Sequence, residues 1–208
     1  MHARRLILVA LIALFMAPLD AQTPQGWRMR VDESKSAEDP DDRPDLKVVA
    51  VGSGMRVTGG PAGTFWNPAN TATGNYTAKA NFTLMKPSGH NNYYGLIFGG
   101  RDLDGPKQAY VYFLVSQNGT YTLRRRVGDA VTDIQARVAH AAIQKPDANG
   151  RSVNAVEVRV AGNTVSYVIN GMVVHTMPKD GTMADGLAGV RVNHQLDVQV
   201  DGFTLQKS

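Results

Sequence analysis

The sequence predicts an all-β protein built as two antiparallel sheets packed face to face. Short runs rich in Val, Tyr, Phe and Thr follow one another from Val48 to the end of the chain. Turn residues such as Asn118-Gly119 and Asn170-Gly171 separate these runs, and no segment has helical periodicity. About a dozen short strands in one domain are typical of a sandwich or a barrel. The sequence has no internal repeat, which argues against a propeller or a β-helix.

The first 21 residues have the three parts of a secretory signal peptide. Arg4 and Arg5 form a basic start, residues 6–17 are apolar, and Pro18 ends this run ahead of Ala21. The apolar run is much shorter than the roughly 20 residues that a membrane-spanning helix needs. We therefore expect cleavage after Ala21 and an exported protein, periplasmic or extracellular, that is not embedded in a membrane.

Composition excludes several classes of function. The chain has no cysteine, which rules out a lipoprotein anchor, a disulfide framework and thiolate metal or redox chemistry. The formal net charge is +4, divided into −2 over residues 22–47 and +5 over residues 48–208. Apart from Arg124–Arg126 the basic residues are scattered, and no nucleic-acid-binding motif accompanies them, so nucleic acid is not an expected partner.

The N-terminal part of the mature chain is expected to differ from the rest. Residues 22–47 include the run "DESKSAEDPDDRPDLK", which is charged and contains two prolines, so it is typical of a linker or a long surface loop. Just ahead of it, residues 26–31 could form a short strand that closes the edge of the sandwich. The sandwich domain itself is expected over residues 48–208.

The remaining elements are expected to be strands joined by turns. The predicted strands are 48–51, 55–58, 76–85, 93–99, 109–116, 120–127, 131–138, 153–160, 164–169, 172–177, 187–193 and 196–206. The last one changes phase at Gly202, which is typical of a β-bulge. Residues 59–68, "GGPAGTFWNP", are expected to form a glycine-rich loop. Its Trp66 either folds over the sheet as an aromatic lip or, as we favour, caps the core.

The hairpin "AYVYFLVSQNGTYTLRRRV" (residues 109–127) allows two registers. A two-residue loop at Asn118-Gly119 pairs Phe113 with Arg124 and mixes apolar and charged residues on one face. A three-residue loop, with Gly119 in a left-handed conformation, pairs Phe113 with Leu123 and gives one apolar face. Because a buried face sets the register, we prefer the three-residue loop. Period-2 alternation then places these residues in the core: Phe82, Leu84, Leu96, Phe98, Val111, Phe113, Val115, Leu123, Val158, Val160, Val198, Val200 and Phe203.

The opposite face of this hairpin is the predicted ligand-binding surface. It carries Tyr110 and Tyr112 beside Arg124 and Arg126, while Arg125 lies on the core side and must reach solvent at the end of the sheet. Aromatic rings stack on the C–H faces of sugars, and guanidinium groups donate to hydroxyls or carboxylates. The alternative is a solvated sheet face with cation–π pairs. If Arg101 shares this face, then so do Gly95, Ile97 and Gly99, which would leave a shallow trough.

Four segments resemble the concanavalin A-like lectin/glucanase superfamily: "YGLIFGGRDLDG", "YVYFLVSQNGTYTLRRRVGD", "NAVEVRVAGNTVSYVINGMVV" and "GLAGVRVNHQLDVQVDGFTL". More narrowly, they are similar to a bacterial domain associated with 3-keto-disaccharide hydrolases. The resemblance covers roughly residues 48–208. It implies a curved jelly roll whose concave face, in many relatives, meets carbohydrate.

The chain departs from its hydrolytic relatives in its carboxylates. Laminarinase-type relatives carry two catalytic glutamates on one strand, as a two-carboxylate mechanism requires. From residue 48 onward this chain has only Glu157, expected to face solvent beside Arg159. Asp102 and Asp104 form an Asp-x-Asp pair in a loop that is either a surface turn, as we favour, or a calcium site. No cofactor is expected otherwise.

The histidines give no metal signature in the sequence. His90, His140, His175 and His194 are scattered, without an H-x-H or HExxH pattern, so no metal site is predicted. His194 precedes the last strand and could reach the rim of the sheet.

Three functions remain in competition. The first is a non-catalytic module that binds a glycan or glycoconjugate through Arg101, Tyr110, Tyr112, Arg124 and Arg126. The second is a hydrolase or lyase acting on 3-keto-glycosides or a related sugar, as the resemblance implies. The third is an envelope protein–protein interaction module. Converging carboxylates or a carboxylate with a histidine would favour an enzyme, whereas a bare apolar patch would favour an interaction module.

Overall fold

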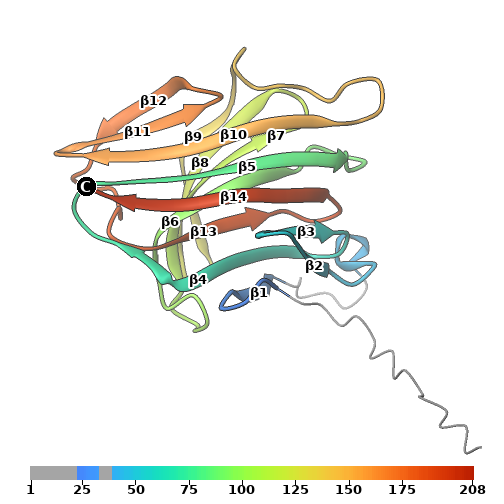
Figure 1. Ribbon diagram of the computed structural model, residues 1–208, viewed down its shortest axis with the longest axis horizontal. Coiled ribbons are helices and arrows are strands. Elements are labelled where there is room, and N and C mark those ends of the chain that lie inside the picture. Colours follow the sequence, from blue (N-terminus) through green and yellow to red (C-terminus); the bar gives the residue numbers. More distant parts are fainter. Residues whose placement is uncertain (1–22, 33–38) are drawn as a thin grey trace, which may run out of the picture.

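The protein is a sandwich of two antiparallel sheets with seven strands each. The computed structural model describes residues 23–32 and 39–208 (Figure 1). The predicted all-β, two-sheet jelly roll is confirmed. The predicted signal peptide lies outside the described residues. Within residues 23–32 and 39–208, no helix is long and apolar enough to cross a membrane.

Strands of the two sheets follow one another in mixed order along the chain, which passes between the sheets several times. Sheet 1 has the strand order β1-β4-β13-β6-β7-β8-β9, and sheet 2 has the order β12-β11-β10-β5-β14-β3-β2. Their bounds are β1 Arg28–Asp32, β2 Lys47–Val51, β3 Gly54–Thr58, β4 Ala62–Ala72, β5 Tyr76–Lys86, β6 Tyr93–Arg101, β7 Ala109–Ser116, β8 Thr120–Val127, β9 Ala130–Ala139, β10 Ser152–Ala161, β11 Thr164–Ile169, β12 Met172–Pro178, β13 Gly186–Val192 and β14 Asp197–Lys207.

The main core lies between the sheets and is built by the predicted alternation. Twelve of the expected core residues are buried there: Phe82, Leu84, Leu96, Phe98, Val111, Phe113, Val115, Leu123, Val158, Val160, Val198 and Val200. Phe203 is only partly buried and packs against them. It follows the predicted bulge, where Gly202 has φ +60° and the β14–β5 register shifts between Asp201 and Thr204.

The β7–β8 hairpin has the predicted three-residue loop. Val115 pairs with Tyr121 and Phe113 with Leu123, and Gly119 has φ +84°. Glycine suits that position because it has no Cβ to resist a left-handed backbone. Tyr110 and Tyr112 are therefore opposite Arg126 and Arg124, respectively, on the face of sheet 1 that points away from sheet 2. We call this the outer face of sheet 1.

Arg125 lies opposite Val111 on the core side of the hairpin, yet it is exposed, as expected. Because the residue is exposed, its side chain contributes little packing. We therefore expect Arg125→Ala to change the free energy of unfolding by no more than about 0.5 kcal/mol. Urea melts of the wild type and this variant measure the difference. A loss of several kcal/mol would mean that Arg125 has a buried partner.

The region predicted as a glycine-rich loop is instead strand β4, and that prediction was wrong. β4 runs between β1 and β13, so its backbone groups are paired in spite of Gly63 and Pro68 within it. Phe65 lies in the main core. Trp66 neither caps that core nor forms a lip, because it is buried on the outer face of sheet 1.

The N-terminal segment also contains more structure than its composition indicates. β1 pairs with the first half of β4 at the edge of sheet 1, and Figure 1 shows it below that strand. Pro40–Asp42 form a 3-10 helix, which Asp39 caps by accepting a hydrogen bond from the Asp41 amide at 3.0 Å. β1 confirms the short strand that was expected at the edge of the sandwich. The 3-10 helix lies in the run that was expected to be a linker or loop without elements, so that expectation was wrong there.

Candidate functional site

The outer face of sheet 1 is not an ordinary solvated face. A second apolar cluster covers it, and its fully buried members include Ile97, Tyr110 and Leu114, which alternate along β6 and β7 with residues of the main core. Because both faces of these central strands are buried, β6 and β7 have nearly continuous apolar sequences. The polar groups of this face are held against that cluster.

A group of charged side chains centres on Asp32 at the end of β1. Its Oδ2 accepts hydrogen bonds from Arg126 Nη1 at 2.8 Å and from Arg191 Nη1 at 2.7 Å. Arg191 also donates to Thr64 Oγ1 at 2.8 Å and to the Tyr110 hydroxyl at 3.1 Å. This arrangement joins the edge strand β1 to β4, β13, β7 and β8, so it fixes the geometry of the whole face.

Two further residues extend the charged group toward the rim. Arg30 Nε lies 3.6 Å from Asp32 Oδ1, and Arg30 Nη1 donates to the carbonyl of Gly105 at 2.7 Å. The amide of Gln108 is oriented with its oxygen toward these arginines. This Oε1 atom accepts hydrogen bonds from Arg30 and, at 3.1 Å, from Arg126 Nη2. Three guanidinium groups thus surround one carboxylate, which leaves an excess of positive charge beneath this face.

A pocket of about 380 Å³ opens on the same face, next to the charged group. Its lining residues are Ala62, His90, Asn91, Asn92, Tyr93, Tyr112, Leu114, Thr122, Arg124, Arg137, Arg191, Asn193 and His194. The lining therefore combines tyrosine rings with three arginines and three asparagines, and none of the described residues that form it is an aspartate or a glutamate.

The charge states of the lining groups follow from burial and neighbours. Burial raises the pKa of Tyr112, although Arg191 and Arg124 oppose the shift, so its hydroxyl stays protonated at neutral pH. Burial disfavours the charge of Arg191, but Tyr110 and Asp32 outweigh this effect and raise its pKa. Burial lowers the pKa of His194 more than Asp41 raises it, which leaves that imidazole mostly neutral at pH 7.

Two lining groups can still meet a ligand. Arg124 forms an ion pair with Asp133, which is half exposed, and its side chain is itself only partly buried, so it can also reach a ligand in the pocket. The buried Oδ1 of Asn193 has no hydrogen-bond partner among the described residues. A guanidinium on the pocket wall can donate to the oxygen atoms of a ligand, and the amide oxygen of Asn193 can accept from its hydroxyl groups. Both groups therefore suit an oxygen-rich ligand.

One end of the pocket is formed by a pair of histidines close to a carboxylate. His90 Nε2 and His194 Nε2 are 3.0 Å apart, and Asp41 Oδ2 lies 3.2 Å from the latter and 3.8 Å from the former. His90 belongs to the β5–β6 loop, His194 to the turn before β14, and Asp41 to the 3-10 helix. Three segments that are distant in sequence therefore meet at the pocket.

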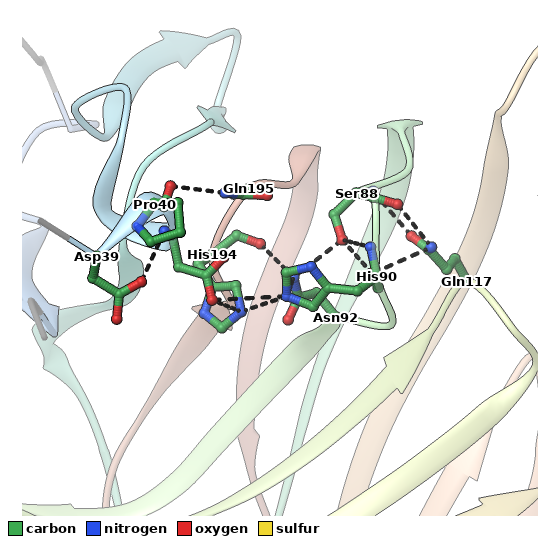
Figure 2. Close-up of polar contacts among 9 residues, drawn as sticks. Asp39, Pro40, Ser88, His90, Asn92, Gln117, His194 and Gln195 are labelled. Atoms are coloured by element: carbon green, nitrogen blue, oxygen red, sulfur yellow. Dashed lines mark hydrogen bonds and ion pairs between the residues drawn. The ribbon is translucent and has the colours of Figure 1, made fainter.

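Hydrogen bonds hold these three segments together (Figure 2). Asn92 Nδ2 donates to the carbonyl of His194 at 2.8 Å, and Gln195 Nε2 donates to the carbonyl of Pro40 at 2.9 Å. Gln117 clamps the β5–β6 loop, because its Oε1 accepts from the Ser88 amide and its Nε2 donates to the Ser88 carbonyl, both at 3.0 Å. These contacts position the segments that carry the imidazoles, and Asn92 Nδ2 also lies 3.2 Å from His90 Nε2 itself.

The structure divides the five residues predicted to bind a ligand. Tyr112 and Arg124 line the pocket. Tyr110 is fully buried and Arg126 is bonded to Asp32, so both lie in the support beneath the face. Arg101 lies elsewhere: a register shift after Phe98 breaks the alternation, and Arg101 is exposed near Asp185, whose pKa it helps to lower after Lys179. The expectation that Arg101 shares the face with Ile97 was therefore wrong.

The carboxylates singled out in the sequence have protein partners. Asp102 Oδ2 accepts from the Lys107 amide at 3.0 Å, whereas Asp104 forms an ion pair with Arg28 at 3.0 Å, so the two side chains bind different groups. Glu157 forms a two-pronged ion pair with Arg159 on β10 of sheet 2, as expected, with bonds of 2.6 and 3.1 Å. None of these three residues lines the pocket.

The sequence reasoning missed several lining residues because they are brought together only by the fold. Arg191 and Arg137 lie in strands where they are spaced like solvent-facing residues, and Asp32 lies in a run expected to be a linker. His90 and His194 are separated by 104 residues. The sequence contained one weak signal for this site. His194 precedes the last strand, and its side chain was expected to reach the rim of the sheet.

Comparison with known proteins identifies the fold class. No protein-family model matches the sequence, and no curated protein matches it either. Among solved structures, the carbohydrate-binding module CBM66 from Bacillus subtilis superposes with a TM-score of 0.62 at 11% identity, over 90% of this chain and 98% of that one.

Two further structures give the same result. A Bacillus subtilis protein of unknown function with a galectin-like fold has a TM-score of 0.56 at 13% identity, covering 86% of this chain and 88% of that one. The catalytic domain of an endo-1,3-β-glucanase (laminarinase) from Thermotoga petrophila has a TM-score of 0.55 at 9% identity. The match covers 90% of this chain and 93% of that one. The chain thus has the jelly-roll fold of the concanavalin A-like class.

Proposed function

We propose that this protein is an exported carbohydrate-binding module whose pocket on the outer face of sheet 1 binds a sugar carrying a carboxylate or sulfate group. The observation that carries the proposal is the pocket lining itself. It places the rings of Tyr93 and Tyr112 beside Arg124, Arg137 and Arg191, without a carboxylate among the described residues that line it.

Each part of this lining has a role in such binding. Tyr93 and Tyr112, each 8% exposed, offer the accessible edges of their rings as apolar contact for the C–H groups of a sugar. Guanidinium groups donate two parallel hydrogen bonds to a carboxylate or sulfate, and charge-assisted bonds of this kind are stronger than neutral ones. Asparagine side chains supply both donors and acceptors for hydroxyls. A neutral sugar would satisfy the rings and amides but would leave the positive charge unmatched.

The similar structures support carbohydrate as the ligand class, since one of them is a carbohydrate-binding module and another a glucanase domain. A glucanase-type activity finds no support in the pocket, because a two-carboxylate mechanism needs a pair of acidic residues there. The exposed large apolar side chains are distributed over β1, β2, β8, β9, β10 and β12, which gives no support to an interaction module with one continuous patch.

A binding screen tests this function. The purified chain is titrated with three classes of polysaccharide: uronic-acid polymers, sulfated polymers and neutral glucans or fructans. We expect binding to an acidic class that weakens as NaCl is raised from low concentration to about 0.5 M, because salt screens charge-assisted contacts at an open pocket. Binding to neutral polymers alone, independent of salt, would contradict the proposal.

The resemblance to 3-keto-disaccharide hydrolases is tested in the same experiment. The chain is incubated with a 3-keto-glycoside, and release of the aglycone is followed. Turnover that Arg124→Ala abolishes and Arg125→Ala preserves would identify the pocket as an active site and replace the binding function by a hydrolytic one.

A further inference from the structure

The side chains of Asp41, His90 and His194 place one ligand atom each within 4.8 Å of one another. The three distances between these atoms are 3.0, 3.2 and 3.8 Å. A tetrahedral Zn²⁺ ion with bonds of about 2.0 to 2.1 Å separates its ligand atoms by roughly 3.3 Å. The observed distances scatter around that value, so an ion fits among the three atoms with only small side-chain movements.

We propose that Asp41 Oδ2, His90 Nε2 and His194 Nε2 form a binding site for a divalent transition-metal ion such as Zn²⁺, at the edge of the pocket on sheet 1, where the two histidines belong to the lining and Asp41 lies just behind them.

The donor set selects the class of metal. Two imidazole nitrogens and one carboxylate oxygen are typical ligands of Zn²⁺ and of its neighbours Co²⁺ and Ni²⁺. Ca²⁺ and Mg²⁺ bind six or more oxygen ligands, and a site with two nitrogens and one carboxylate does not offer these. The site would therefore discriminate against the two most abundant divalent ions outside cells.

Hydrogen bonds outside the cluster bring the three segments that carry the ligands together. Gln195 ties the turn of His194 to the carbonyl of Pro40, next to Asp41, and Asn92 ties that turn to the loop of His90. The amide of Asp41 is itself bonded to Asp39 at 3.0 Å. These bonds run to backbone groups of the three segments, so the segments that carry the ligands are held together without an ion.

The location gives the ion access to a ligand. Both His90 and His194 line the pocket, and three protein ligands leave at least one coordination position for water or another oxygen. Metal binding itself does not depend on the proposed sugar function, since it can be measured without any glycan.

The experiment titrates the full chain, purified without a histidine tag and dialysed against a chelator, with Zn²⁺ in a calorimeter. We expect one ion per chain, a higher melting temperature with Zn²⁺, and no binding of Ca²⁺ or Mg²⁺ at the same concentrations. Titration with Co²⁺ should produce visible absorption bands that added Zn²⁺ abolishes. This spectrum needs no variant and reports directly on nitrogen and oxygen ligands.

Matched variants locate the ion. His90→Gln and His194→Gln should each weaken Zn²⁺ binding about 100-fold or more, because each removes one of three ligands. His140→Gln is the control: His140 Nδ1 accepts from the Ala142 amide far from the cluster in sequence, and this variant should bind as the wild type does. Circular dichroism of the metal-free proteins checks that all of them fold.

Two outcomes would overturn the inference. One is a wild-type chain that binds no transition metal at micromolar concentrations, which would leave the cluster as a hydrogen-bonded pair of imidazoles beside a carboxylate. The other is equal Zn²⁺ affinity in wild type, His90→Gln and His194→Gln, which would place the ion elsewhere. Neither outcome bears on glycan binding, so failure of this inference is distinguishable from failure of the proposed function.

Discussion

Replacing Phe113 by alanine is expected to lower the free energy of unfolding by about 3 to 5 kcal/mol, because it removes a large buried side chain and leaves a cavity that its neighbours fill only in part. Phe113 is fully buried at the centre of β7. Its ring packs edge-on against Tyr121 of the same sheet at 5.7 Å and against Tyr167 of the opposite sheet at 5.2 Å. It therefore links the two sheets.

Urea melts of the wild type and Phe113→Ala measure this loss. Val127→Ala, at an exposed position of the neighbouring strand β8, is the control and should change the midpoint little. A loss below about 1 kcal/mol for Phe113→Ala would place the ring on an exposed face, and the β7–β8 register would then be wrong.

Replacing Asp32 by alanine is the second large expected effect. Asp32 is the carboxylate that neutralises Arg126 and Arg191, whose side chains are 16% and 11% exposed. Its removal leaves two largely buried guanidinium groups with uncompensated charge. We expect a loss of about 3 kcal/mol, the lower end of the range for breaking a buried pair, since some solvent reaches this group.

Asp104→Ala is the matched control for Asp32→Ala. Asp104 also forms an ion pair with an arginine of β1, but both side chains of that pair are about 60% exposed. Exposed pairs contribute at most about 1 kcal/mol, so the control should lose little. Equal losses for the two variants would show that burial adds nothing to the Asp32 pairs.

An anion at millimolar concentration, such as sulfate, is expected to restore part of the stability of Asp32→Ala by replacing the missing charge.

Much of the fold could be predicted because alternation is read locally. Val111, Phe113 and Val115 stand at every second position, and one buried face was enough to select the correct hairpin register. β4 could not be predicted in the same way. Gly63 and Pro68 within it, and the Gly-Gly-Pro run just ahead of it, are typical of loops. Only its position between β1 and β13 supplies the backbone partners that make it a strand.

The candidate site was predictable only in part, for a related reason. Tyr112 and Arg124 lie on neighbouring strands, so the hairpin register alone brings them together. Asp32 and Arg191 meet across 159 residues, and that contact depends on the order of strands in the sheet. The prediction that the outer face is open was also too simple, because a second apolar cluster buries Tyr110 there and only one end of the face remains a pocket.

The central claim is that the pocket on the outer face of sheet 1 binds an acidic sugar. It is tested most directly by comparing Arg124→Ala with Arg125→Ala in calorimetric titrations with the acidic glycan that the screen selects. The two arginines are neighbours on β8, but Arg124 lines the pocket and Arg125 is exposed on the opposite face. We predict that Arg124→Ala weakens binding about 10-fold or more, the loss of one charge-assisted contact, while Arg125→Ala binds as the wild type does. Equal affinity in all three proteins, or a loss confined to Arg125→Ala, would contradict the assignment of the pocket.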